Sequence, residues 1–176
     1  MIEIRPATES DFEQIWLIFS EVVSRGDTYA FSPKTSKSEA EQIWMKVPQM
    51  TYVAVNLDNI LGTYYLKPNQ PGLGSHVCNA GFMVAASARG KGIGRLMGEH
   101  SLKTARNLGF KAMQFNFVVS TNQRAIKLWK ELGFQIVGTL PNAFLHQELG
   151  FVDVYVMYQE LGVRTQNSGV RININN

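Results

Sequence analysis

A glycine-rich, basic run lies near the middle of the chain, with the sequence RGKGIGR at positions 89–95. Its alternating glycines let backbone N–H groups turn toward a ligand without an obstructing Cβ, as an anion-binding loop requires. A helix that begins here adds its unpaired first-turn N–H groups and the positive end of its dipole. With the charges of Arg89, Lys91 and Arg95, these features predict a site for a phosphate or pyrophosphate.

The spacing of the glycines decides between the known phosphate-binding patterns. A P-loop requires GxxxxGK followed by Ser or Thr, and the sequence contains no such string. The dinucleotide fingerprint GxGxxG also fails, because its third glycine would fall at Arg95 or at Met97. An ordinary surface turn before a helix stays open as the alternative.

The elements around this run must hold it in place. Residues 76–84 form an apolar, β-inclined stretch, which predicts a strand that leads into the turn. From Ile93 onward, apolar and weakly polar residues recur near the helical period, and Gly109 suits the end of that helix. The same patterns predict a strand at 112–119 and a helix at 122–133.

The remaining segments complete the order β-α-α-β-β-β-α-β-α-β-β without an internal repeat. Further strands are expected at 2–6, 50–57, 60–66, 134–140 and 151–158, and further helices at 8–26 and 36–48. Val47 is expected to face the core, and residues 141–150 are expected to form a loop. In the polar tail, Val170, Ile172 and Ile174 alternate like an edge strand.

Composition favours a single globular domain. The chain has 176 residues, 45% of them hydrophobic, which is enough for a sizeable core. It has no apolar run of 18 residues and no signal pattern, so we expect neither membrane spanning nor secretion, and a cytoplasmic location is the default. Cys78 is the single cysteine, which excludes an internal disulfide and a Cys-based metal cluster, and no metal is expected.

Positive charge is concentrated in one part of the chain. Between Arg89 and Lys130 there are nine Lys or Arg residues and one acid, Glu99. A basic half of this kind is compatible with nucleic-acid binding. However, no basic, aromatic-interleaved recognition motif accompanies it, and a polyanionic small ligand explains the same asymmetry. We therefore expect no nucleic-acid partner.

Two motifs carry a resemblance to a known family. The pattern [Q/R]xxGx[G/A], formed here by Arg89, Gly92 and Gly94, resembles the acetyl-CoA signature of the GCN5-related N-acetyltransferases (GNAT). About thirty residues later stands a second motif of that family, Asn-x-x-Ala, an aromatic residue, then Gly-Phe. Its members here are Asn122, Ala125, Trp129, Gly133 and Phe134. The resemblance covers roughly residues 2–160.

The resemblance implies a mixed α+β (α/β) GNAT fold. Its central, mostly antiparallel seven-stranded sheet would splay between the fourth and fifth strands, here 76–84 and 112–119, and four helices would flank it. The single acetyltransferase domain would span 1–160, and 161–176 would be a polar tail. Acetyl-CoA, as cosubstrate, would lie in the V between the splayed strands, where its amide arm satisfies unpaired backbone groups.

The family also implies which residues hold acetyl-CoA. The backbone at Phe82, Met83 and Val84 would pair with the pantetheine arm. Asn122 would hydrogen-bond the pantetheine, with Ala125 and Trp129 of the same helix beside it. The pyrophosphate would lie on the N–H groups of Arg89, Gly90, Lys91, Gly92, Ile93, Gly94 and Arg95.

The implied reaction is direct attack of a neutral amine on the thioester in a ternary complex. A backbone N–H, by resemblance that of Val84, would stabilise the developing oxyanion. Many family members carry a Tyr acid where this chain has Trp129, and an indole cannot protonate sulfur. We favour departure of the thiolate without a dedicated acid, and leave Tyr64 and Tyr155 open as substitutes.

The general base is not evident from the sequence. The strand at 76–84 has no carboxylate, and its His76 is either a base or a surface residue. His146 and Glu148, in the loop expected at 141–150, are candidates for contact with the substrate, and the alternative is that they are ordinary loop residues. Cys78 is expected to be a small core residue, since direct transfer needs no nucleophile, and His100 is expected to pack.

Asn79 and Asn116 are polar residues in the two strands expected to flank the cleft, where burial is otherwise favoured. Buried amides need partners, so the two either satisfy each other or the splayed backbone, or they bind a small substrate. Together with GDTYAF at 26–31, they resemble acetyltransferases that detoxify proline analogues such as azetidine-2-carboxylate, in which such asparagines hold the amino acid. The acceptor expected is therefore a small-molecule amine.

Other functions stay open. One is a protein acetyltransferase acting on an N-terminus or a lysine, although the stretch 26–35 offers Asp27 as its one acid for a basic peptide. Another is a non-catalytic acyl-CoA-binding module, although its glycine turn would then be expected to erode. Dimers are common in the family, so a homodimer is also open.

Overall fold

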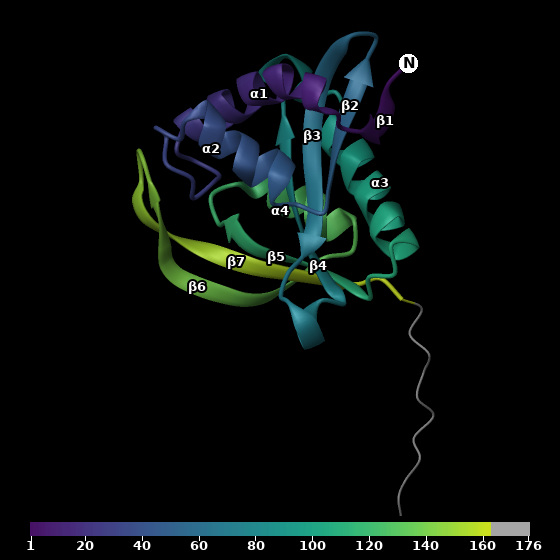
Figure 1. Cartoon of the computed structure of the whole chain (residues 1–176). Coiled ribbons are helices and arrows are strands. Elements are labelled where there is room, and N and C mark those ends of the chain that lie inside the picture. Colours follow the sequence, from purple (N-terminus) through teal and green to yellow (C-terminus); the bar gives the residue numbers. More distant parts are fainter. Residues whose placement is uncertain (163–176) are drawn as a thin grey trace, which may run out of the picture.

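A seven-stranded mixed sheet runs through the molecule in the order β1-β2-β3-β4-β5-β7-β6 (Figure 1). In this computed structural model, which describes residues 1–162, only β4 and β5 pair in parallel. The expected mixed, mostly antiparallel seven-stranded sheet is thus confirmed, whereas the strand expected at 170–174 lies outside the described residues. The strands are β1 (Glu3–Pro6), β2 (Met50–Asn56), β3 (Asn59–Pro68), β4 (Val77–Val84), β5 (Ala112–Val119), β6 (Gln135–His146) and β7 (Gly150–Glu160).

Helices cover both faces of the sheet (Figure 1). They are α1 (Phe12–Ser24), α2 (Lys37–Glu41), α3 (Ile93–Asn107) and α4 (Gln123–Glu131). On one face, Phe19 and Trp44 are fully buried in a core formed with α1. On the other, Met97 of α3 and Trp129 of α4 are buried in a second core. Among the described helices, none is both long and apolar enough to cross a membrane.

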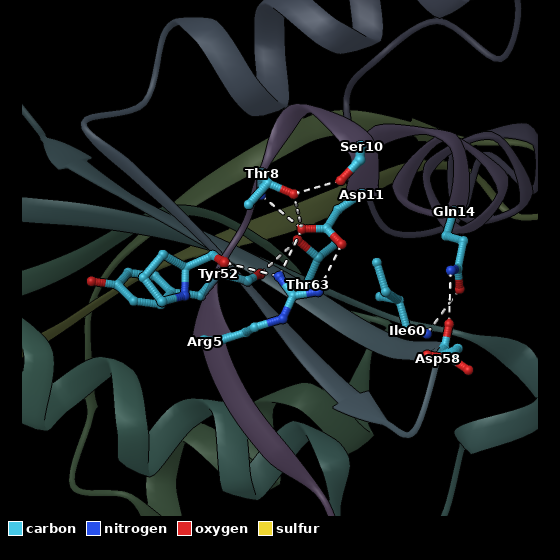
Figure 2. A network of polar contacts seen from close by, with 10 residues as sticks. Arg5, Thr8, Ser10, Asp11, Gln14, Tyr52, Asp58, Ile60 and Thr63 are labelled. Carbon is cyan, nitrogen blue, oxygen red and sulfur yellow. Dashed lines mark hydrogen bonds and ion pairs between the residues drawn. The ribbon is translucent and has the colours of Figure 1, made fainter.

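A polar network ties β1 to the start of α1 (Figure 2). The Arg5 guanidinium donates two hydrogen bonds, of 2.7 and 2.8 Å, to the Asp11 carboxylate. Asp11 also accepts from the main-chain N–H and the hydroxyl of Thr8, at 2.7 and 2.9 Å, which forms a capping box. Hydrogen bonding from Arg5 lowers the pKa of Asp11 to about 2.

The second helix begins as expected but ends differently. Ser36 and Glu39 form a capping box at the start of α2, and the chain then continues as a π-helical turn at Gln42–Lys46. In that turn the Val47 N–H donates to the Gln42 carbonyl at 2.9 Å, five residues back. The extra residue rotates Val47 outward, where 64% of it is exposed, so the expected inward position is wrong.

The last two strands are longer than expected, and they form a hairpin. Pro141 lies inside β6, at a shift in its register with β7. Because β6 is an edge strand, a residue without an N–H is tolerated at such a bulge. Asn142 adopts a φ of 51°, and its N–H donates to the Asp153 carboxylate at 2.9 Å. The expected loop at 141–150 is therefore wrong, since β6 continues to His146 and β7 begins at Gly150.

Candidate active site

The sheet splits between β4 and β5, as the family resemblance implied. The two strands pair only where Val77 lies opposite Ala112 and Cys78 opposite Met113. Beyond these pairs, β4 keeps its full ladder with β3 on one side but has no strand partner on the other. Backbone groups on that side must find other partners or a ligand.

Asn79 stands at the point where the pairing stops. Its Nδ2 donates to the Gln114 carbonyl on β5 at 3.0 Å, and its Oδ1 accepts from the Tyr65 hydroxyl at 3.2 Å. The side chain is buried and satisfies the splayed backbone, one of the two roles open from the sequence. An amide group has a second N–H and a second lone pair, so Asn79 also keeps capacity for a ligand.

A tyrosine from the loop after α1 reaches the unpaired side of β4. The Tyr29 hydroxyl accepts from the Phe82 N–H and donates to the Phe82 carbonyl, both at 2.8 Å. Burial raises the pKa of Tyr29 far above its usual range, so the hydroxyl stays protonated. The polar groups of an antiparallel strand alternate in direction, and those of Val84 therefore face the same side as those of Phe82.

Two adjoining cavities follow this side of β4. The first, the glycine cavity, has a volume of about 540 Å³ and includes Gly90, Gly92 and Gly94. The second, the asparagine cavity, has a volume of about 400 Å³ and includes Asn79 and Asn116. The cavities meet at lining residues that they share: Thr28, Tyr29, Phe82, Asn122, Ala125 and Trp129.

The glycine cavity has the geometry of an anion-binding turn. Gly90 and Gly92 both adopt φ of 80°, and Gly92 is the N-cap of α3. The first helical bond runs from the Leu96 N–H to the Gly92 carbonyl at 3.0 Å, so the N–H groups before Leu96 have no helical acceptor. A Cβ at Gly92 would meet no atom within 4 Å, which leaves the turn open to a ligand. Ile93 is buried and offers only its main chain.

The basic residues of this cavity differ from those expected. Arg89 and Arg95 line it, but each has a carboxylate partner, Glu21 at 3.3 Å for Arg89 and Glu131 for Arg95. Lys91 is exposed and does not line it. A different cation does: the Arg124 guanidinium approaches the turn, 3.6 Å from where a Gly90 Cβ would stand. Only its place two residues after Asn122 in the sequence hinted at this role.

Asn122 and Trp129 place α4 against both cavities. The Asn122 Oδ1 accepts from the Ala125 N–H at 3.2 Å and so caps α4, which leaves its Nδ2 donors for a ligand. The Trp129 ring is largely buried, with its centroid 4.8 Å from those of Phe82 and Phe115. It therefore forms part of an aromatic wall where the two cavities meet.

Asn116 is placed differently from Asn79. It is exposed, although burial was expected, because β5 has already left β4 at this point. Its Nδ2 donates to the Asn69 Oδ1 at 2.6 Å, and its Oδ1 accepts from the Gln114 side chain at 2.8 Å. The two expected asparagines thus line one cavity from its two strands without bonding each other.

Other candidates from the sequence lie away from both cavities. The Tyr64 hydroxyl is bonded to the His100 Nδ1 at 2.6 Å within the core. Cys78 is buried, and burial raises the pKa of its thiol to about 12, in keeping with a packing role. Neither cavity is lined by any of Tyr64, Tyr155, His76, His146 or Glu148.

The cavities contain little negative charge. Asp27 lines the glycine cavity, with its Oδ1 3.9 Å from the Arg25 Nε, and no other described carboxylate lines either cavity. Both of these atoms, and the Thr28 hydroxyl, are buried without a hydrogen-bond partner. Within residues 1–162, no group of three or more His, Cys, Asp or Glu side chains is placed to hold a metal ion.

Comparison with known proteins finds acetyltransferases similar to this chain. The model of the acetyltransferase (GNAT) family matches residues 12–134. The N-acetyltransferase aca1 of Schizosaccharomyces pombe is 36% identical over 151 residues, which cover 76% of this chain and 72% of that protein. The structure of a GCN5-related N-acetyltransferase from Kribbella flavida is 44% identical with a TM-score of 0.86, covering 90% of this chain and 97% of that one.

A more distant structure shares the fold. It is a GNAT superfamily phosphinothricin acetyltransferase from Sinorhizobium meliloti in complex with AcCoA, 21% identical to this chain with a TM-score of 0.83. The alignment covers 92% of this chain and 89% of that protein.

Proposed function

The chain belongs to the acetyltransferase (GNAT) family, and we propose that it transfers an acetyl group from acetyl-CoA to an amine of a small molecule. The observation that carries this proposal is the junction of two cavities at Phe82, one lined by the glycine turn and the other by two asparagines. An acetyl-CoA-dependent N-acetyltransferase must hold donor and acceptor in contact, and a shared wall provides that.

Acetyl-CoA supplies an activated acetyl group as a thioester. The N–H groups from Gly92 to Arg95 fit its pyrophosphate, because they point from a helix N-terminus into an open turn. The main chain of Val84 fits the amide arm, because its groups face the split. At Phe82 the Tyr29 hydroxyl holds the same groups, so a ligand can pair there only when Tyr29 moves.

The protein contributes little acid or base to the transfer. The amine nitrogen attacks the carbonyl carbon, the C–S bond breaks, and the sulfur leaves as a thiolate. The Val84 N–H supports the negative charge on the carbonyl oxygen. Within residues 1–162, no carboxylate lines the asparagine cavity, so the amine proton passes to solvent. Trp129 carries only an indole N–H, so we propose that no side chain protonates the sulfur.

The acceptor is proposed to be small. A cavity of about 400 Å³ suits a single small molecule better than a protein segment. Asn79 and Asn116 reach it from the two sides of the split, each with hydrogen-bonding capacity left over. An amino acid such as a proline analogue is the narrower candidate, supported by the resemblance of these positions to acetyltransferases that act on such compounds.

Location and assembly are proposed from the sequence. We propose a cytoplasmic enzyme, since the sequence has no export pattern, and a homodimer, since dimers are common in the family. Light scattering on the purified protein measures the second: a monomer at micromolar concentration contradicts it.

Two measurements test the proposed function together. Calorimetry is expected to show acetyl-CoA binding, and a thiol-release screen over amino acids, polyamines, aminoglycosides and short peptides is expected to show turnover with a small amine. Binding without thiol release from any acceptor would indicate a non-catalytic acyl-CoA module. Turnover restricted to peptides would indicate a protein acetyltransferase.

A further inference from the structure

The charge that lines the asparagine cavity has one sign. Its lining includes amides, hydroxyls and aromatic rings, but among the residues that the structure describes it includes no Asp or Glu. Lys67, near the end of β3, is the one residue with a formal charge in the described lining. Nothing in the sequence had distinguished this lysine from others on the surface.

Lys67 is positioned against the residues at the split. It lies directly opposite Asn79 in the β3–β4 ladder, so both side chains project from the same face of the sheet. Two residues earlier on that face is Tyr65, opposite Gly81. The Lys67 Nζ stands 5.6 Å from the centre of the Tyr65 ring. Its ammonium therefore leans along β3 toward Gly81, the residue before Phe82.

The Tyr65 ring explains why the ammonium can take this position. The ring lies against Gly81, where a Cβ would come within 2.6 Å of its Cε1 atom. Its hydroxyl is fixed by Asn79 at 3.2 Å. The ring thus forms a floor over which a cation is attracted. No described carboxylate forms an ion pair with Lys67, so its charge is available to a ligand.

A cavity with one cation and no carboxylate selects among amines. A polyamine, an aminoglycoside or a peptide lysine carries extra positive charge, which Lys67 repels and no carboxylate balances. An amine that carries its own carboxylate gains a charge-assisted hydrogen bond instead.

We propose that Lys67 binds the carboxylate of the acceptor, and that the acceptors are amino or imino acids whose amine lies within a few bonds of that carboxylate. This inference rests on the proposed function, because it assigns the acceptor of the same site. Lys67 acts here as a specificity-determining residue. It has no part in the bond changes of the transfer.

The test compares acceptors that differ only in charge. Azetidine-2-carboxylate and its carboxamide form one pair, and proline and prolinamide form another. In the unaltered enzyme the carboxylate member is expected to have the lower KM. With Lys67→Met, which keeps an apolar stem on the Tyr65 ring, its KM is expected to rise about 10- to 100-fold, with kcat nearly unchanged. The KM of the carboxamide should stay the same.

Two variants serve as controls. Lys67→Arg keeps the charge and is expected to restore most of the affinity for the carboxylate. Lys127→Met removes an exposed lysine from α4 that lines neither cavity, and it should leave both acceptors unchanged. Calorimetry with acetyl-CoA should give the same Kd for all four proteins, which shows that the donor site is intact.

The outcomes separate this inference from the proposed function. Equal KM values for carboxylate and carboxamide, equal losses for both in Lys67→Met, or preferred turnover of polyamines would overturn the role of Lys67 while leaving an acetyltransferase. If no acceptor is turned over, the proposed function fails. Calorimetry of azetidine-2-carboxylate with the acetyl-CoA-loaded protein then decides: binding that Lys67→Met abolishes supports the anion site, and no binding overturns it.

Discussion

Polar side chains are treated in opposite ways in two regions of this molecule. Around Asp11, the carboxylate accepts hydrogen bonds from Arg5 and Thr8, and the network closes on itself. Around the split, Asp27 Oδ1 and Thr28 Oγ1 are buried without hydrogen-bond partners, and Lys67 has no described ion pair. The first region is complete and stabilises the fold. The second is incomplete, as a site must be before its ligands arrive.

The largest effect on ligand binding is expected from a substitution in the glycine turn. Gly92→Glu places a carboxylate where the pyrophosphate would lie, and we expect acetyl-CoA affinity to fall by about 100-fold or more, as measured by calorimetry. Gly109→Glu is the matched control, because Gly109 also has a positive φ, of 88°, and open space at its Cβ position. Both variants should lose about 1–2 kcal/mol of stability from backbone strain. Equal affinity in the two would contradict the pyrophosphate assignment.

Breaking the hydrogen-bond network around Asp11 should lower stability and leave acetyl-CoA binding unchanged. Asp11→Asn leaves the Arg5 guanidinium without its carboxylate, and we expect the free energy of unfolding to fall by about 2 kcal/mol in urea titrations. Acetyl-CoA affinity of the folded protein should not change. Glu13→Gln is the control: it removes an ion pair with Lys37 whose glutamate side chain is 76% exposed, so its cost should stay below about 1 kcal/mol.

The same carboxylate predicts a dependence of stability on pH. The pKa of Asp11 is lowered from 3.8 to about 2 in the folded chain, so the folded state favours its charged form. The resulting stabilisation is fully present above the unfolded pKa and is lost as pH falls through the folded value. Urea titrations between pH 5 and pH 2 should therefore show a decline to which Asp11 contributes. A decline of equal size in Asp11→Asn would exclude that contribution.

A smaller effect on acetyl-CoA affinity is expected at Tyr29, whose hydroxyl bonds the Phe82 main chain where the ligand is proposed to pair. Tyr29→Phe removes the hydroxyl that pairs with Phe82 but keeps a ring to stack on Phe31, whose centroid is 5.6 Å away. Acetyl-CoA no longer has to displace a hydrogen bond, and its affinity should rise about 3- to 10-fold. Tyr65→Phe removes a hydroxyl from the same cavity without this effect. Weaker binding in Tyr29→Phe would mean that the hydroxyl itself contacts acetyl-CoA.

The smallest functional change is expected at Trp129. Trp129→Tyr restores the residue usual in the family, yet the indole packs between Phe82 and Phe115 and fills a wall of both cavities. We expect thiol release not to accelerate, and stability to fall by about 1 kcal/mol through lost ring contact. A faster reaction would instead show that the transfer lacks an acid.

Elements that depend on local sequence patterns were predicted correctly. The glycine turn and the helix that follows it depend on neighbouring residues, and both were predicted. Val47 and Pro141 were misplaced because a π-helical turn and a bulge each insert residues that periodicity does not reveal.

Part of the lining of the two cavities was predicted from the sequence, and the lining residues that were not predicted share one cause. Tyr29 meets Phe82 across 53 positions of sequence, and Lys67 meets Asn79 only through strand pairing. Arg124 reaches Gly90 from another helix. Such approaches depend on tertiary packing, which a residue's own neighbours do not encode. The asparagines were found because an amide is unusual in a strand that is otherwise apolar.

The contact at Gly26 has a consequence for how such an enzyme can diversify. The Gln147 side chain, at the tip of the β6–β7 hairpin, lies where a Gly26 Cβ would stand, within 2.5 Å of it. The Gln147 N–H also donates to the Gly26 carbonyl at 3.3 Å. The tip of the β6–β7 hairpin thus supports the loop that carries Tyr29. Insertions or deletions at the hairpin tip are therefore expected to shift the Tyr29 loop, and with it the part of the lining that the two cavities share.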